Sequence, residues 1–259
     1  MKLLSLSFLL SLSVVAVQAQ TAAPVAPAKP AAPAVKPPAM PPQPPDVAAP
    51  KYGKDGKVDA GFAAAHANFV KTAQQGKAEL VFLGDSITAG WGGKKDIWEK
   101  AFGAYQPVNF GIGGDRTQHV LWRIQNGELD GIKPKAVVLM IGTNNSGNDS
   151  AEGIAKGITV IVKTIREKQP QAKILLLAVF PRGEKASPNA GRDKLKQVNA
   201  IIAKLDDGKN IHFLDIGAKF LQPDGSITRE TMPDFLHLTA AGYQIWADAI
   251  SPKLAELMK

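Results

Sequence analysis

The chain has 259 residues, a formal net charge of +8 at pH 7 and no cysteine. The lack of cysteine excludes disulfide bonds and thiolate metal sites, so the fold depends on neither. The lysines and arginines are scattered rather than gathered in a basic run interleaved with aromatic residues, which argues against a nucleic-acid-binding protein. We expect the charge to serve solubility, with a mild attraction to acidic glycans or anionic surfaces.

Residues 1–20 have the pattern of a secretory signal peptide. Lys2 supplies the positive start, residues 3–17 are apolar apart from serines, and Val17-Gln18-Ala19 forms a small-residue cleavage site. An uncleaved membrane anchor is the alternative, but the apolar stretch is short for a hydrocarbon core of about 30 Å. No cysteine follows for a lipoprotein anchor, and no later segment resembles a transmembrane helix. The expected location is therefore secreted or periplasmic.

Residues 21–50 consist almost wholly of alanine, proline, valine and lysine. Such a tract cannot bury a core and has few backbone donors, so it predicts an extended, semi-rigid linker. We favour a spacer over a proline-rich ligand for a partner protein. The remaining residues, 51–259, have the length of a single α/β domain.

Apolar and amphipathic segments alternate through this domain. The sequence predicts strands over residues 80–83, 107–110, 136–141, 174–179 and 211–214. It predicts helices over residues 62–75, 96–102, 118–125, 151–168 and 193–205, and a last helix that Thr239 caps and that ends at about residue 258. The apolar run at 136–141 has no polar alternation, which indicates burial on both faces of a parallel sheet. The alternation predicts an open parallel sheet with helices on both faces.

Three polar motifs lie at the ends of predicted strands. GDSITAGWG, with Ser86, follows the first strand; NFGIGGD, with Gly114, runs out of the second; IGTNN, with Asn144, follows the third. Ligands of open parallel sheets bind beyond the carboxyl ends of the strands. We therefore expect these motifs to meet at one edge of the sheet.

The segment DFLHLTAAGY, far downstream, supplies the other parts of a hydrolytic triad. A serine hydroxyl is a poor nucleophile until a base takes its proton, and His237 can do that for Ser86. Asp234, three residues before His237, can hold the imidazole in the correct tautomer. The candidate catalytic residues are therefore Ser86, Asp234 and His237.

A tetrahedral intermediate also needs hydrogen-bond donors for its oxyanion. The candidates are the backbone N–H groups of Ser86 and Gly114 and the side-chain amide of Asn144. Taken singly, each feature has a plainer reading: Ser86 as a helix cap, the glycines and Asn144 as turn residues, His237 as a structural histidine. These readings together require four coincidences at one edge of one sheet, so the hydrolytic site is favoured.

Other polar residues are expected to be structural. Asp85 is expected to bond local backbone amides rather than act on a substrate. His66, His119 and His212 lie on predicted helices or a strand, and no two histidines have metal-ligand spacing, so no metal site is expected. The glycine motifs lack the G-K-[ST] ending of a phosphate-binding P-loop.

The segments GDSITAGWG, NFGIGGDRT, IGTNN and DFLHL resemble the four sequence blocks of the SGNH or GDSL-type hydrolases. The longer runs NFGIGGDRTQHVLWRIQNGELDGIKPK, PQAKILLL and PRGEK resemble the intracellular platelet-activating factor acetylhydrolase catalytic subunits of that family. The resemblance implies a flavodoxin-like three-layer α/β/α sandwich with a parallel five-stranded sheet, and no metal or organic cofactor. It places the block residues at Ser86, Gly114, Asn144 and His237, with Asp234 as the triad acid.

The sequence departs from that family in two places. Ile87 stands where the GDSL name has leucine, and a signal peptide and linker replace an intracellular start. In the acetylhydrolases, the positions that match Ile87, Thr143 and Leu236 confine the acyl pocket, so bulky side chains here imply selection of a short acyl group. The family's catalytic subunits pair as dimers, which the resemblance permits for this chain.

The sequence thus predicts a secreted or periplasmic serine esterase that removes acetyl or other short acyl groups through an acyl-enzyme. The substrate is expected to be a small acyl ester or an acetylated glycan. Two alternatives stay open: a lysophospholipase or thioesterase, and a non-catalytic glycan-binding module held on a tether. A preference for long acyl chains distinguishes the first, and glycan binding without ester hydrolysis distinguishes the second.

Overall fold

A computed structural model of the protein describes residues 43–259. The predicted signal peptide and residues 21–42 of the predicted linker lie outside the described residues. Within the described part, no helix is both long and apolar enough to cross a membrane.

Five parallel strands form one sheet, as the sequence predicts. In space they run in the order β2-β1-β3-β4-β5, and every neighbouring pair is parallel. This is the flavodoxin-like strand order. The chain adds β2 on one side of β1 and then adds β3, β4 and β5 on the other side, and in such sheets ligands bind at the carboxyl ends of the two strands where the order switches, here β1 and β3. The strands are β1 (Leu80–Gly84), β2 (Pro107–Gly111), β3 (Ala136–Met140), β4 (Lys173–Leu177) and β5 (Ile211–Leu214).

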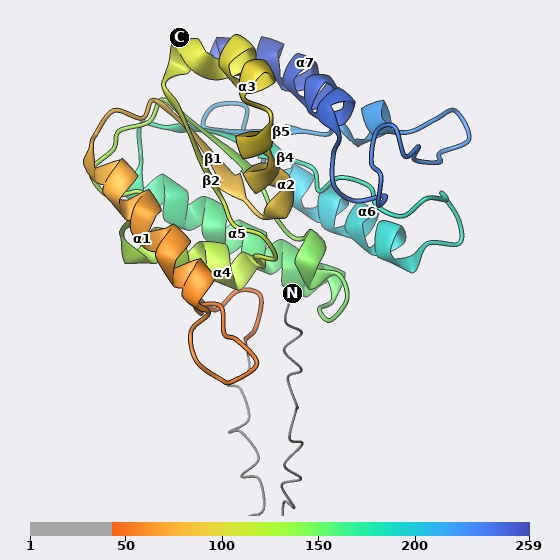
Figure 1. Cartoon of the computed structure of the whole chain (residues 1–259), viewed down its shortest axis with the longest axis horizontal. Helices are drawn as coiled ribbons and strands as arrows, with labels where there is room; N and C mark the ends of the chain where they lie inside the picture. Colours follow the sequence, from red (N-terminus) through yellow and green to blue (C-terminus); the bar gives the residue numbers. More distant parts are fainter. Residues whose placement is uncertain (1–42) are drawn as a thin grey trace, which may run out of the picture. The chain divides into compact units, whose positions relative to one another are not determined.

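Helices cover both faces of the sheet and complete the predicted three-layer sandwich (Figure 1). One layer contains α1 (Ala60–Gln74), α4 (Thr117–Arg123), α5 (Ala151–Lys168) and α6 (Ala190–Ile202). The opposite layer contains α3 (Lys95–Phe102) and α7 (Ala240–Leu257), and the short helix α2 (Ser86–Ala89) follows β1. Thr239 caps α7 as predicted, because its side chain accepts a hydrogen bond from the N–H of Gly242.

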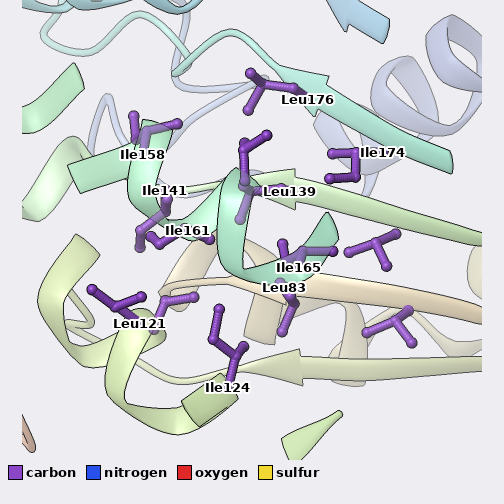
Figure 2. Packing of buried hydrophobic residues seen from close by; sticks show 14 of the residues in the cluster. Leu83, Leu121, Ile124, Leu139, Ile141, Ile158, Ile161, Ile165, Ile174 and Leu176 are labelled. Carbon is purple, nitrogen blue, oxygen red and sulfur yellow. The ribbon is translucent and has the colours of Figure 1, made fainter. Parts of the chain in front are cut away.

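The strands are apolar on both faces because each face packs on a helical layer. In β1, Val81 and Leu83 contact the layer that contains α5, whereas Leu80 and Phe82 contact the layer that contains α7. All five residues of β1 are buried, and so are all five of β3. Figure 2 shows how one apolar stripe of α5 fills the space beneath the sheet; the stripe comprises Ile158, Ile161 and Ile165. This burial on both sides explains the uninterrupted apolar runs of the sequence.

Residues 43–50, which composition assigns to the linker, pack against α4 and α5. The Thr117 hydroxyl donates to the carbonyl oxygen of Pro45 at 2.7 Å, and the N–H of Ala49 donates to the carbonyl oxygen of Gln118 at 3.2 Å. Gly157 in α5 allows Pro45 to approach the helix closely, because a Cβ on Gly157 would overlap the carbonyl oxygen of Pro45. A side chain and a backbone carbonyl of α4 thus give this proline-rich segment the hydrogen-bond partners that it cannot supply itself, and the packed domain includes it.

Candidate active site

Ser86 is the first residue of α2 and lies directly beyond the carboxyl end of β1. Asp85 caps the helix, because its Oδ1 accepts the N–H of Ile87 at 2.9 Å, as expected for a structural aspartate. Gly84 makes the tight strand-to-helix turn possible, since a Cβ there would overlap the hydroxyl of Thr88. The turn therefore presents the Ser86 side chain at the edge of the sheet where the predicted motifs meet.

The structure brings Ser86, His237 and Asp234 into one chain of hydrogen bonds. Ser86 Oγ lies 2.8 Å from His237 Nε2, and His237 Nδ1 lies 2.6 Å from Asp234 Oδ2. The first pair is separated by 151 residues in sequence, so only the fold unites them. The His237 side chain is 44% exposed and that of Asp234 is 54% exposed, which leaves the serine and the imidazole within reach of a solute.

The loop that carries Asp234 and His237 is fixed by its own backbone. Asp234 Oδ1 accepts the N–H groups of Leu236 at 3.1 Å and His237 at 2.8 Å, so both carboxylate oxygens are engaged. Burial opposes ionisation of Asp234, but its hydrogen bonds with His237 outweigh that effect and lower the pKa of the carboxyl. The group is therefore an anion that accepts from imidazole Nδ1 and leaves Nε2 free to accept from Ser86.

A left-handed residue shapes the same loop. Phe235 has a φ of +59°, a conformation that is uncommon for aromatic residues. Its carbonyl oxygen accepts the N–H of Gly183 at 2.8 Å, and the guanidinium of Arg229 lies 4.6 Å from the centre of its ring. These contacts hold Phe235 from two sides and so fix the residues on either side of it, Asp234 and Leu236.

The three predicted oxyanion donors also lie at this edge. A Cβ built on Gly113 would lie 4.0 Å from the Cβ of Ser86, so the glycine loop passes beside the serine. Gly114 has a φ of +73°, which favours glycine. Asn144 Nδ2 donates to the carbonyl oxygen of Asp115 at 2.9 Å, which joins the third motif to the glycine loop. A carboxamide has two N–H bonds, so Asn144 keeps one for another acceptor.

The three predicted pocket residues adjoin the same groups in sequence but differ in exposure. Ile87 is 1% exposed and Thr143 is 2% exposed, whereas Leu236 is half-buried. Ile87 and Leu236 belong to the apolar cluster between the sheet and α7. Thr143 is held by Arg182, whose Nη1 donates to the threonine carbonyl and hydroxyl oxygens, both at 3.1 Å. The sequence did not reveal this role of Arg182, although the residue lies in the PRGEK segment that resembles the acetylhydrolases.

Asp85 is buried to 1% exposure next to the nucleophile candidate, and burial raises the pKa of its carboxyl to about 6. Its pKa in the unfolded chain is 3.8, so the protonated form is favoured by folding. The contribution of this group to stability is therefore fully present below about pH 4 and is lost as the pH rises through about 6.

Asp85→Asn should remove this pH dependence, because asparagine keeps the Oδ1 acceptor and does not titrate. The free energy of unfolding of the wild type relative to the variant should decrease as the pH rises from about 4 to about 7. Urea titrations of both proteins at several pH values measure that difference. A difference that stays constant over this range would contradict the assigned titration.

A buried charge cluster beneath the site was not predicted. Arg123, Asp115 and Glu128 are all 0% exposed. Arg123 Nε donates to Asp115 Oδ2 at 2.9 Å, Nη1 donates to Glu128 Oε1, and Nη2 donates to the carbonyl oxygen of Gly84 at 3.3 Å. One guanidinium thus ties the end of β1 to the glycine loop. In the sequence, the cluster is marked only by an arginine on the apolar face of α4, and the spacing of residues does not identify Asp115 and Glu128 as its partners.

The ionisation of this cluster follows from its burial. Burial opposes the charge on Arg123, but attraction to Glu128 and Asp115 outweighs it and raises the pKa of the guanidinium. Burial raises the pKa of the Asp115 carboxyl to about 7, although Arg123 and Lys51 act against that rise. Arg123 is therefore a permanent cation between two carboxyl groups, and its removal would leave them buried without their partner.

Two of the remaining histidines, His66 and His119, contact protein groups. His66 Nε2 lies 3.1 Å from the carbonyl oxygen of Asn126, and His119 Nδ1 accepts the N–H of Arg116 at 3.1 Å. Burial lowers the pKa of His119 to about 3, so its ring is neutral. Within residues 43–259, no group of three or more His, Asp or Glu side chains is arranged to hold a metal ion.

The family model for the GDSL-like lipase/acylhydrolase family matches residues 82–245, from β1 into α7. The human platelet-activating factor acetylhydrolase IB subunit alpha1 is 42% identical to this chain over 194 residues, which cover 74% of this chain and 82% of that subunit. The chain belongs to the GDSL-like lipase/acylhydrolase family. It is therefore a carboxylic ester hydrolase, as the sequence predicts.

Solved structures agree with this family at the level of the fold. A GDSL-like lipase from Bacteroides thetaiotaomicron is 20% identical, with a TM-score of 0.61 over 74% of this chain and 97% of that one. A carbohydrate acetylesterase family member from Sinorhizobium meliloti is 19% identical, with a TM-score of 0.54 over 70% of this chain and 99% of that one. The three-layer fold predicted for a GDSL-type hydrolase is thereby confirmed.

Proposed function

We propose that this hydrolase removes acetyl or other short acyl groups from esters through an acyl-enzyme on Ser86. The observation that carries the proposal is the hydrogen-bonded chain from Ser86 through His237 to Asp234, with distances of 2.8 and 2.6 Å. A serine hydroxyl on a neutral imidazole that a carboxylate orients is the arrangement that activates serine as a nucleophile.

In the acylation step, His237 Nε2 takes the proton from Ser86 Oγ as Oγ bonds to the ester carbonyl carbon. The electron pair of the carbonyl bond moves to its oxygen, and Asp234 stabilises the positive charge on the imidazole. When the tetrahedral intermediate collapses, the bond to the alcohol breaks and the alcohol takes the proton from His237. A water molecule then repeats the sequence on the acyl-enzyme, releasing the carboxylic acid and restoring Ser86.

The oxyanion formed in each step needs donors that are already in place. The backbone N–H groups of Ser86 and Gly114 and the free N–H of the Asn144 amide are assigned to it. Loss of one such donor typically lowers the rate by ~100- to 1000-fold. The hydrogen bond between Asn144 and Asp115 supports the assignment, because it fixes two of the three donors relative to each other.

A short acyl group is proposed from the side chains that adjoin the site. Ile87 and Thr143 are buried beside Ser86 and Asn144 in sequence, and Leu236 precedes His237. Two compared proteins carry names that include acetyl ester hydrolysis: platelet-activating factor acetylhydrolase and carbohydrate acetylesterase. Their alcohols differ, so an acetyl group is the feature that the names share.

An acyl-length series of p-nitrophenyl esters tests this proposal. We expect kcat/KM to be highest for acetate and to fall at least about tenfold by octanoate, because each excess methylene must find space among packed side chains. Leu236→Ala should move the preference toward longer chains by enlarging the pocket. Faster turnover of octanoate than of acetate would instead indicate a lysophospholipase or thioesterase.

We also propose that the protein is secreted or periplasmic and that the alcohol half of its substrate belongs to a glycan. The signal peptide pattern supports a secreted or periplasmic enzyme, and in that setting an acetylated glycan is a more accessible ester than an intracellular phospholipid. Hydrolysis of acetylated xylan, acetylated sugars and short-chain phospholipid esters by the purified domain distinguishes these substrates. Glycan binding without any hydrolysis would favour a binding module. Pairing of two chains, which the family resemblance permits, is tested separately by light scattering.

A further inference from the structure

Lys51 reaches from the N-terminal segment to the glycine loop of the site. Its backbone carbonyl oxygen accepts the N–H of Asp59 at 2.8 Å, which fixes the start of the side chain. Its Nζ donates a hydrogen bond to the carbonyl oxygen of Gly113 and lies 3.9 Å from Asp115 Oδ1. The side chain is 25% exposed, so most of it is covered. A residue from outside the family-matched region thus contacts the loop that passes beside Ser86.

The peptide unit between Gly113 and Gly114 links Lys51 to the proposed oxyanion donor. A trans peptide is planar, and its C=O and N–H bonds point in opposite directions. The carbonyl oxygen of this unit belongs to Gly113 and accepts from Lys51, and the N–H belongs to Gly114. Fixing the carbonyl on one side therefore fixes the direction of the N–H on the other. The N–H of Asp115 donates to the carbonyl oxygen of Ile112 at 3.2 Å and closes a turn over Gly113 and Gly114. Because two consecutive glycines have little conformational preference of their own, the Lys51 contact adds a second constraint on the peptide unit between them.

The Asp115 carboxylate explains why the ammonium stays over this carbonyl. Asp115 is 0% exposed, and its Oδ2 accepts from Arg123. Its Oδ1 is buried and has no hydrogen-bond partner among the residues that the structure describes. Lys51 Nζ lies 3.9 Å from this oxygen; His119 Nδ1 lies at 3.8 Å but accepts from Arg116 and cannot donate in that state. The ammonium is therefore the cation that faces the unpartnered oxygen, and attraction to the ionised form of Asp115 keeps Lys51 in place. Because burial raises the pKa of Asp115 to about 7, this attraction is strongest above neutral pH, whereas the hydrogen bond to the glycine loop does not depend on it.

We propose that Lys51 is a positioning residue for ester hydrolysis, which aims and polarises the N–H of Gly114 toward the oxyanion. This role rests on the proposed function, in which Gly114 is an oxyanion donor. A charged donor on the carbonyl increases the polarity of the whole peptide unit, because linked hydrogen bonds strengthen one another. The N-terminal segment thereby contributes to catalysis and does more than join the domain to its linker.

Lys51→Met tests the role, because methionine keeps an unbranched apolar stem and removes the charged donor. We expect kcat for p-nitrophenyl acetate to fall about 10- to 100-fold, less than for loss of a whole oxyanion donor, with KM changed by less than about threefold. Lys51→Arg should recover most of the rate, since it restores a cationic donor. The matched control is Lys54→Met, an exposed lysine in the same segment, which should leave kcat unchanged.

A trifluoromethyl ketone supplies a readout that a merely structural role would not move. It forms an oxyanion adduct with an active-site serine, so its Ki should rise in Lys51→Met by the same factor as kcat/KM falls. An unchanged kcat, or a change confined to KM, would overturn the proposal. If Lys51→Met fails to fold, kcat and Ki are measured instead for Lys51→Gln, which keeps a neutral donor. A fall in kcat with a matching rise in Ki would again support the proposal, and an unchanged kcat would overturn it. Failure of the proposed function is recognised separately, because Ser86→Ala would then hydrolyse the ester as fast as the wild type.

Discussion

Replacement of Ser86 by alanine should lower kcat/KM for p-nitrophenyl acetate by about 10⁴- to 10⁶-fold. The hydroxyl is the group proposed to form the bond to the acyl carbon, and the alanine side chain has no group that can take its place. The melting temperature should stay the same, since Asp85 rather than Ser86 caps α2. The hydroxyl of Ser86 contacts the His237 ring and is not needed to hold the turn.

Steady-state kinetics and thermal unfolding of the variant measure the two effects. The matched control is Ser251→Ala in α7, where the hydroxyl donates only to the carbonyl oxygen of Ala247 within the same helix. That variant should retain full activity. Undiminished hydrolysis by Ser86→Ala would rule out the acyl-enzyme mechanism, and a large loss of stability would show that the residue has a structural role as well.

Arg123→Met should reduce the free energy of unfolding by about 3–5 kcal/mol, the usual cost of removing one partner from a buried ion pair. Arg123 is the shared partner of Asp115 and Glu128, all at 0% exposure. Without it, two carboxyl groups stay buried and have to be protonated or hydrated. The carbonyl oxygen of Gly84 also loses a donor, so the end of β1 is loosened beside Ser86.

Urea unfolding at neutral pH measures the loss, with Lys163→Met on the exposed face of α5 as a control that should change stability little. Adding Asp115→Asn and Glu128→Gln to Arg123→Met should recover part of the loss, because no unpaired charge then remains buried. A loss below about 1 kcal/mol for Arg123→Met alone would contradict the prediction, since the cluster would then stabilise the fold no more than a surface ion pair does.

The layout of the sheet could be predicted from the sequence because strands that are buried on both faces are apolar at consecutive positions. The runs around Phe82 and Val138 are apolar at every position, and their order with the intervening helices implied a parallel sheet. The placement of Ser86, Gly114 and Asn144 beyond strand ends then followed from where parallel strands end. These features are local in sequence or follow from a general rule of the fold.

Features that depend on long-range contacts could not be predicted. The start of helix α6 is a separate case, because its signal is local: the helix begins at Ala190 rather than at the predicted residue 193, and Asn189 caps it by accepting the N–H of Arg192. Residues 43–50 were assigned to the linker by composition, and nothing in that composition reveals the acceptor and donor groups of α4 that hold them. The partners of Arg123 and the reach of Lys51 likewise become visible only when the chain is folded.

The proposed mechanism makes the Ser86 hydroxyl the nucleophile and His237 the base that activates it. A fluorophosphonate, which modifies activated serine hydroxyls, tests this most directly when combined with peptide mapping by mass spectrometry. We expect one adduct, on the peptide that contains Ser86, formed in step with the loss of activity and greatly slowed in His237→Ala. Complete inactivation with the adduct on another residue, or modification of Ser86 at an equal rate in His237→Ala, would contradict it.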